Sequence, residues 1–215
     1  MPRQEPSVGR AAEKGWGGLP GETNRDLWGL IRFSHIFGSA VRELLEVKVL
    51  EEVGADHLSL PQLHLLQLIT LNGRHQIGQI ADFLGVSPPA ATKNVDKLER
   101  LGLVTRTPSE LDRRATLLAS SAEGRKLVER FESLKLKRLE PVLDAFSAEE
   151  LIQLQSLLER FSTALIRSGG DGIEGLCLRC SAYFDASCPI RHYHDGCPYQ
   201  KLVASESPPS CGLED

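Results

Sequence analysis

The chain has 215 residues, of which 41% are apolar and 25% charged, and its formal net charge is −4. This length is enough for one packed domain with an appendage, or for two small domains. The composition is typical of a soluble globular protein, and no apolar stretch approaches the roughly 20 residues of a membrane-spanning helix. The negative charge excludes a uniformly basic protein, although only the local field at a docking face matters for DNA binding.

Residues 1–23 are expected to form a flexible leader rich in Gly, Pro and charged side chains. Its cations Arg3, Arg10 and Lys14 are not followed by an apolar segment. A secretory signal requires such a segment. We therefore expect a cytoplasmic protein with no membrane partner.

Apolar periodicity and helix-ending residues predict four helices in the first half of the chain. Apolar residues recur at steps of three and four, which is the spacing of an amphipathic helix. We expect Ser59 to cap the second helix, and Gly85 and Gly102 to end the third and fourth. The predicted helices cover residues 24–53, 59–72, 76–84 and 86–101.

A β-hairpin is predicted directly after the fourth helix. Residues 103–107 and 115–119 have the composition of strands, and the polar segment 108–114 between them predicts a charged turn. Helix, tight turn, helix and hairpin in this order make up a winged helix-turn-helix unit. The predicted DNA-binding lobe covers residues 60–119.

Two long amphipathic helices are predicted after the hairpin, in residues 123–146 and 147–166. Ser147 and Glu150 have the spacing of a capping box at the start of the second one. The apolar residues of these helices are too numerous for one covered face, which is typical of a dimer interface. The expected fold class is therefore mainly α, a winged helix-turn-helix with a helical dimerisation region and a small cysteine-rich, metal-binding tail.

The fourth helix is predicted to have a buried face and a DNA-facing one. Ala91, Val95 and Leu98 are spaced for burial. Ala90 is small enough for its end of the helix to enter a major groove about 12 Å wide. Ser87, at the positive end of the helix dipole, suits either a phosphate contact or a cap. The opposite face presents Pro89, Lys93, Asp96, Lys97 and Arg100, with Thr92 and Asn94 on its flanks.

The hairpin tip carries Asp112-Arg113-Arg114. Its two guanidinium groups could enter a minor groove or bind phosphates, with Asp112 orienting one of them through a salt bridge. Lys97 and Arg100 could equally be solvated surface charges. The predicted DNA-binding residues are Ser87, Pro89, Ala90, Thr92, Lys93, Asn94, Lys97, Arg113 and Arg114.

Residues 60–124 resemble the multiple-antibiotic-resistance (MarR) regulator family. The matching segments, in order, are Ile77-Gly78-Gln79-Ile80-Ala81, Leu84-Gly85-Val86-Ser87, Leu98-Glu99-Arg100-Leu101-Gly102-Leu103-Val104, Asp112-Arg113-Arg114 and Ser121-Ala122-Glu123-Gly124. With the outer helices the resemblance covers about residues 24–167. Pro88-Pro89 departs from the small or polar residues of the family and argues against direct base readout at these two positions.

The resemblance implies a homodimer that binds double-stranded DNA at a pseudo-palindromic operator. Residues 24–56 and 123–167 would form the dimerisation helices, and the fourth helices would enter successive major grooves. The alternative is a winged helix that binds another protein.

All five cysteines lie in the segment 168–215, which is predicted to be a separate tail. Clustered cysteines in a cytosolic chain are typical of a metal site rather than a disulfide scaffold. We expect Cys211 to be a bystander, and His192 and His194 to serve as ligands only if one replaces a cysteine. The predicted ligands are Cys177, Cys180, Cys188 and Cys197.

An iron–sulfur cluster is the favoured occupant of the tail, with structural zinc as the alternative and disulfides or free thiols as a third possibility. Cys188 and Cys197 are each followed by proline, as is the last cysteine of bacterial ferredoxin motifs. Zinc binds four thiolates equally well. The favoured hypothesis is a regulator whose DNA affinity depends on the cluster. The alternatives are a regulator controlled by an organic anion or phenolic effector, with a zinc tail, and a redox enzyme, against which the chain shows no nucleotide-binding loop or nucleophile–base pair.

Overall fold

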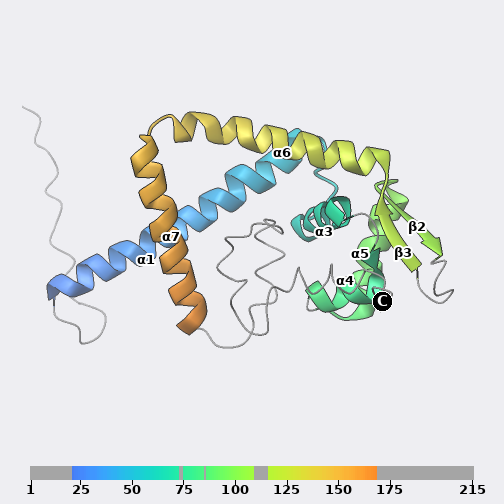
Figure 1. The fold of residues 1–215 in the computed structure, drawn as a ribbon, viewed down its shortest axis with the longest axis horizontal. Helices are drawn as coiled ribbons and strands as arrows, with labels where there is room; N and C mark the ends of the chain where they lie inside the picture. The colour runs from blue at the N-terminus through green and yellow to red at the C-terminus, as the bar shows by residue number, and fades with distance from the viewer. Residues whose placement is uncertain (1–20, 73–74, 85, 109–115, 169–215) are drawn as a thin grey trace, which may run out of the picture. The chain divides into compact units, whose positions relative to one another are not determined.

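The computed structural model describes residues 21–72, 75–84, 86–108 and 116–168 (Figure 1). They form a mainly helical protein with one small antiparallel sheet, and the chain divides into two units, Met1–Leu44 and Leu45–Asp215. None of the described helices is long and apolar enough to cross a membrane. In chain order the elements are α1 (Gly21–Arg42), η1 (Glu43–Val47), α2 (Lys48–Glu52), α3 (Leu60–Asn72), β1 (His75–Gln76), α4 (Ile77–Leu84), α5 (Pro88–Arg100), β2 (Val104–Pro108), β3 (Thr116–Ser120), α6 (Ala122–Leu143) and α7 (Ala148–Ser168).

The first predicted helix forms, but it is not continuous. Residues 43–47 adopt a π-helical turn between α1 and α2. The apolar periodicity did not predict the π-helical turn. Such a turn changes the hydrogen-bond register only locally and leaves the helical pattern on either side intact. The large apolar side chains of α1 are exposed on the single chain; they are Leu27, Trp28, Leu30, Ile31, Phe33, Ile36 and Phe37.

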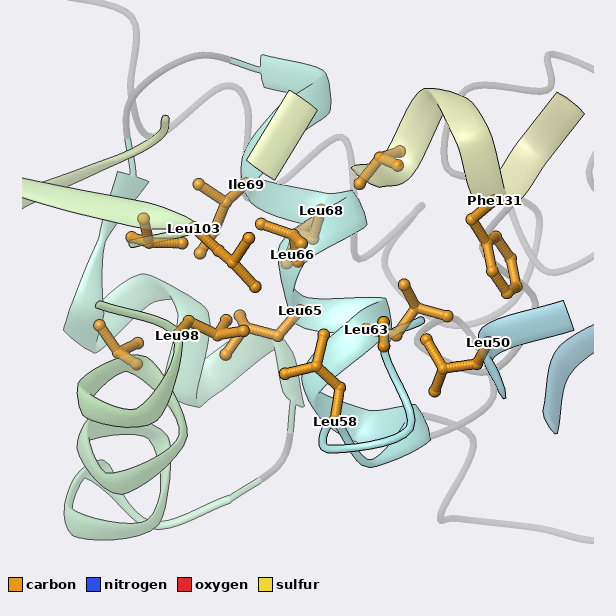
Figure 2. Close-up of a cluster of buried hydrophobic side chains, with 14 of the residues drawn as sticks. Leu50, Leu58, Leu63, Leu65, Leu66, Leu68, Ile69, Leu98, Leu103 and Phe131 are labelled. Atoms are coloured by element: carbon orange, nitrogen blue, oxygen red, sulfur yellow. The ribbon is translucent and has the colours of Figure 1, made fainter. Parts of the chain in front are cut away.

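Helix α3 forms the centre of the second unit, as Figure 2 shows. Apolar residues surround its axis on all sides, which is the pattern of a helix buried within a core. Its fully buried side chains are Leu63, Leu65, Leu66, Leu68 and Ile69. Leu50 of α2, Leu98 of α5 and Phe131 of α6 complete the same cluster.

The sheet has the strand order β1-β3-β2, with both pairs antiparallel. The predicted hairpin is confirmed with each strand one residue further along the chain, so Pro108 ends β2 rather than opening the turn. Strand β1 was not predicted, because two residues are too few to show an alternating pattern. His75 of β1 pairs with Leu118 of β3.

His75 is a buried polar residue within this core. Burial lowers the pKa of its imidazole below the ordinary value, because a charged ring would lose its hydration, and a hydrogen bond to the backbone of Leu68 opposes this only in part. The ring is therefore neutral at pH 7. A neutral ring is compatible with a place between an apolar helix and the sheet.

A Schellman motif ends α5, as the glycine at its end predicted. Gly102 has a left-handed φ of 71°. The N–H of Gly102 donates to the carbonyl of Glu99 at 2.8 Å, and that of Leu103 donates to Leu98 at 2.9 Å. These two bonds are those that define the motif. They set the direction in which the chain leaves α5 and enters β2.

The start of α6 is bound to the same turn. Ser121 donates its N–H to the carbonyl of Leu103 at 2.9 Å and its hydroxyl to that of Gly102 at 2.6 Å. The Ser121 hydroxyl also caps α6 by accepting from the N–H of Gly124 at 3.0 Å. Helix α6 is therefore attached directly to the connection between α5 and the hairpin.

The predicted capping box between α6 and α7 is confirmed. Ser147 donates its N–H to Glu150 Oε2 at 2.8 Å, and Glu150 donates its N–H to Ser147 Oγ at 3.2 Å. Helix α7 has no buried residue on the single chain. Its exposed large apolar side chains are Ile152, Leu154, Leu157, Leu158 and Leu165.

Candidate nucleic-acid interface

Helix α5 is placed by its apolar face, as predicted. Ala91, Val95 and Leu98 are all fully buried. The helix packs on α4, α3 and β2. The remaining faces of α5 are thereby directed away from the core, and their side chains divide into an exposed set and a set bound by neighbouring elements.

The hydroxyl cap, which is one of the two roles predicted for Ser87, does not form at the start of α5. Ser87 is the N-cap residue by position, but its side chain makes no capping hydrogen bond. A cap hydroxyl normally accepts from the second or third helical N–H. The second position is Pro89, which has no N–H, and the N–H of Ala90, at the third position, donates to the Ser87 carbonyl at 2.9 Å instead. The exposed Ser87 hydroxyl is not used by the helix.

The N-terminal half of α5 is its open part. Pro89, Ala90 and Lys93 are exposed there beside Ser87. Thr92 is half-buried, and its hydroxyl donates to the Pro88 carbonyl at 2.8 Å. This surface consists of small side chains and one ammonium group. The small side chains allow the helix backbone to approach another molecule closely.

One flank of α5 is bound to α3 and to the segment that leads into it. Asn94 Oδ1 accepts a hydrogen bond from Gln62 Nε2 at 3.3 Å. Lys97 Nζ donates to the carbonyl of His57 at 2.6 Å. Asn94 and Lys97, both predicted DNA-binding residues, therefore have partners within the protein that hold the helix.

The other flank is bound to the hairpin by Arg106 of β2. Its guanidinium group lies 2.5 Å from Asp96 Oδ1 and 3.1 Å from Glu99 Oε2. Helical spacing predicted an outward position for Asp96, but no pattern in the sequence identified Arg106 or Glu99 as its neighbours. The i, i+3 spacing of Asp96 and Glu99 indicates only that the two carboxylates lie on the same side of α5. Their shared partner on β2 could be identified only from the tertiary structure.

Several predicted site residues lie outside the described part of the chain. These are the hairpin-tip residues Asp112, Arg113 and Arg114, the helix-ending Gly85, and the tail residues Cys177, Cys180, Cys188, His192, His194, Cys197 and Cys211. Within the residues that the structure does describe, no group of three or more metal-binding side chains comes together.

A second polar group, not predicted from the sequence, lies on α3. His64 and Gln67 are buried in spite of their polarity. His64 Nε2 lies 3.6 Å from Glu46 Oε1, and Gln67 Nε2 donates to Glu132 Oε1 of α6 at 2.5 Å. Among the described residues, the Oε1 atom of Gln67 is buried with no hydrogen-bond partner. Buried polar atoms without a hydrogen-bond partner are unusual in a protein core.

Comparisons with known proteins agree with this architecture. Residues 58–116 match the family model "MarR family". YusO from Bacillus subtilis has a similar structure, with 23% identity, a TM-score of 0.55, and coverage of 65% of this chain and 97% of that one.

Two further solved structures are similar. FabT from Streptococcus pneumoniae, solved in complex with DNA, has 22% identity, a TM-score of 0.55, and coverage of 64% of this chain and 98% of its own. A MarR family protein from Bacillus stearothermophilus has 20% identity, a TM-score of 0.56, and coverage of 66% and 96%. These likenesses show the winged helix fold. The segment that matches the family model runs from the end of the loop before α3 to the first residue of β3, and it includes α3, β1, α4, α5 and β2. Over residues 58–116, this chain is therefore similar to the MarR family.

Proposed function

We propose that the protein is a dimeric transcription regulator that binds duplex DNA through α5 and the β2–β3 hairpin. The observation that carries the proposal is the exposed N-terminal half of α5, within the segment that matches the MarR family model. FabT, whose structure is similar, was solved with DNA bound.

The geometry of α5 supports contacts through its N-terminal half. Proteins of this class insert a helix into the major groove with its first residues nearest the bases. Ser87 offers a hydroxyl that the helix does not use, Ala90 allows close approach, and Lys93 supplies a cation for a phosphate. Pro89 can make only apolar contacts, so it contributes shape rather than hydrogen bonds.

Dimerisation is supported by the apolar side chains that α1 and α7 expose on the single chain. An exposed apolar surface of this extent marks an interaction site in a protein that remains in solution. Two-fold symmetry would present two copies of α5 to one duplex, and the operator would share that symmetry.

Replacing the cations of the proposed interface should weaken DNA binding and reduce its dependence on salt. Lys93→Ala, Arg113→Ala and Arg114→Ala each remove one candidate phosphate-binding group per subunit. For every phosphate that is no longer neutralised, the slope of log affinity against log salt should fall by about 0.9. The measurement is fluorescence anisotropy at several KCl concentrations, with a duplex enriched by the wild-type protein from a random-sequence pool.

Lys137→Ala is the matched control, since Lys137 is an exposed lysine on α6. It should leave both affinity and slope unchanged. An affinity and slope equal to the wild type in all three interface variants would show that α5 and the hairpin tip do not form the DNA-binding surface.

We also propose that the tail holds an iron–sulfur cluster that modulates DNA binding. Cys177, Cys180, Cys188 and Cys197 supply four thiolates, two of them in a CxxC spacing, which is a sufficient donor set for a cluster. The tail directly follows α7 in the chain. A change in the cluster could therefore shift the balance between two arrangements of the dimer, for which a differential of a few kcal/mol is enough.

Anaerobic reconstitution with iron and sulfide is expected to produce broad visible absorption, with iron and sulfide bound to the protein. Cys177→Ser with Cys180→Ser should abolish the absorption, whereas Cys211→Ser should leave it unchanged. A colourless protein with one zinc ion per chain would exclude the cluster in favour of structural zinc. Equal DNA affinity with and without a cluster would exclude its sensory role but not DNA binding.

A second candidate is control by a small organic anion or phenolic compound, with a structural zinc tail. The buried Gln67 on α3 favours the phenolic compound, because its unused acceptor can take a hydrogen bond from a phenol hydroxyl. An anion would instead be repelled by the carboxylate of Glu132, to which Gln67 Nε2 donates. Release of DNA by such a compound, and not by an oxidant or chelator, would distinguish this candidate from the cluster hypothesis.

A further inference from the structure

Arg106 forms a charged triad with two carboxylates of the proposed DNA-binding helix. Asp96 and Glu99 lie one turn apart on α5, and the single guanidinium group of Arg106 contacts both. The Asp96 and Glu99 side chains remain 45% and 40% exposed, whereas that of Arg106 is only 26% exposed. The cation is therefore enclosed between β2 and α5, and the anions face the solvent.

The electrostatic field at the surface of α5 depends on the ion pairs that Arg106 forms with Asp96 and Glu99. The described residues of α5 include three cations, Lys93, Lys97 and Arg100, and two anions, Asp96 and Glu99. Lys97 is held at the His57 carbonyl, on the other flank. A DNA phosphate approaching α5 would meet the field of two half-exposed carboxylates within a Debye length of about 10 Å at 0.1 M salt.

We infer that Arg106 supports DNA binding through α5 by neutralising Asp96 and Glu99. The inference rests on the proposed DNA-binding function. A planar guanidinium group can contact two separate carboxylates at once, which suits this role. Without Arg106, the two carboxylates would repel phosphates from the helix.

The test is a set of charge-removing variants assayed on the duplex enriched by the wild-type protein from a random-sequence pool. We expect Arg106→Gln to lower affinity about tenfold at 0.1 M KCl, because like charges are then left facing each other. The loss should shrink as salt is raised, since screening weakens the repulsion. Removing both carboxylates in the same background, as R106Q/D96N/E99Q, should restore affinity to within about threefold of D96N/E99Q.

The rescue separates this role from a purely structural one. A triple variant that binds as weakly as Arg106→Gln would overturn the inference, because removing the acids repairs neither a misplaced helix nor a missing direct bond from Arg106 to phosphate. Arg106→Lys, which keeps the charge, should bind within about threefold of the wild type. If Arg106→Gln fails to fold, as judged by circular dichroism, Arg106→Lys becomes the test. A tenfold loss of DNA affinity in Arg106→Lys would then overturn the inference.

The same assay distinguishes a failure of the inference from a failure of the proposed function. A wild-type protein that enriches no duplex removes the proposed function and this inference together. A wild-type protein that binds DNA, with an Arg106→Gln variant of equal affinity, removes the inference alone.

Discussion

Replacing Gly124 by alanine should lower the free energy of unfolding by about 3 kcal/mol, the upper range for forcing one extra carbon into a packed site. A Cβ atom at this position would lie 2.1 Å from the carbonyl oxygen of Leu103 and 3.2 Å from Cδ1 of Leu66. The carbonyl cannot move away freely, because it accepts the N–H of Ser121 and belongs to the turn that ends α5. Urea denaturation at fixed protein concentration measures the loss.

Gly78→Ala is the matched control for this prediction. Gly78 is also helical, in α4, but a Cβ there would meet nothing within 4 Å. Alanine should therefore stabilise the protein by up to about 1 kcal/mol through its higher helix propensity. Equal stability of Gly124→Ala and the wild type would show that α6 does not approach the α5–β2 turn as closely as the structure indicates.

Replacing Leu157 by glutamate should dissociate the proposed dimer. Leu157 is 58% exposed on the single chain and lies on the apolar stripe of α7 that also includes Leu154, Leu158 and Leu165. Burying a leucine contributes about 1.5–3 kcal/mol, and symmetry places the change in the interface twice. A loss of about 5 kcal/mol raises the dimer dissociation constant more than a thousandfold. Sedimentation velocity at micromolar concentration should then show monomer.

Ser156→Glu supplies the control, since it introduces the same charge next to Leu157 but on a different side of α7. This variant should sediment as the wild-type dimer does. A dimer that persists in Leu157→Glu would show that α7 does not form the interface, and would leave α1 and α6 as the candidates.

The candidate site could be predicted from the sequence only where the evidence was local. The burial of Ala91, Val95 and Leu98 follows from helical spacing, and the end of α5 follows from Gly102, so both predictions are confirmed. The failed cap at Ser87 was also a local matter. Ser87 is suited to a cap by its residue type, but the proline at the second helical position lacks the N–H that such a cap would use.

The amino-acid sequence by itself determined the order and type of the long elements, because periodicity, caps and turn residues act over a few neighbouring positions. Only the tertiary structure decided which side chains of α5 are open and which are bound. Arg106 meets Asp96, and Lys97 meets the His57 carbonyl 40 positions away, because the core brings the three segments together. A pairing between distant segments leaves no local pattern, so the distinction between the open and the bound halves of α5 was absent from the sequence.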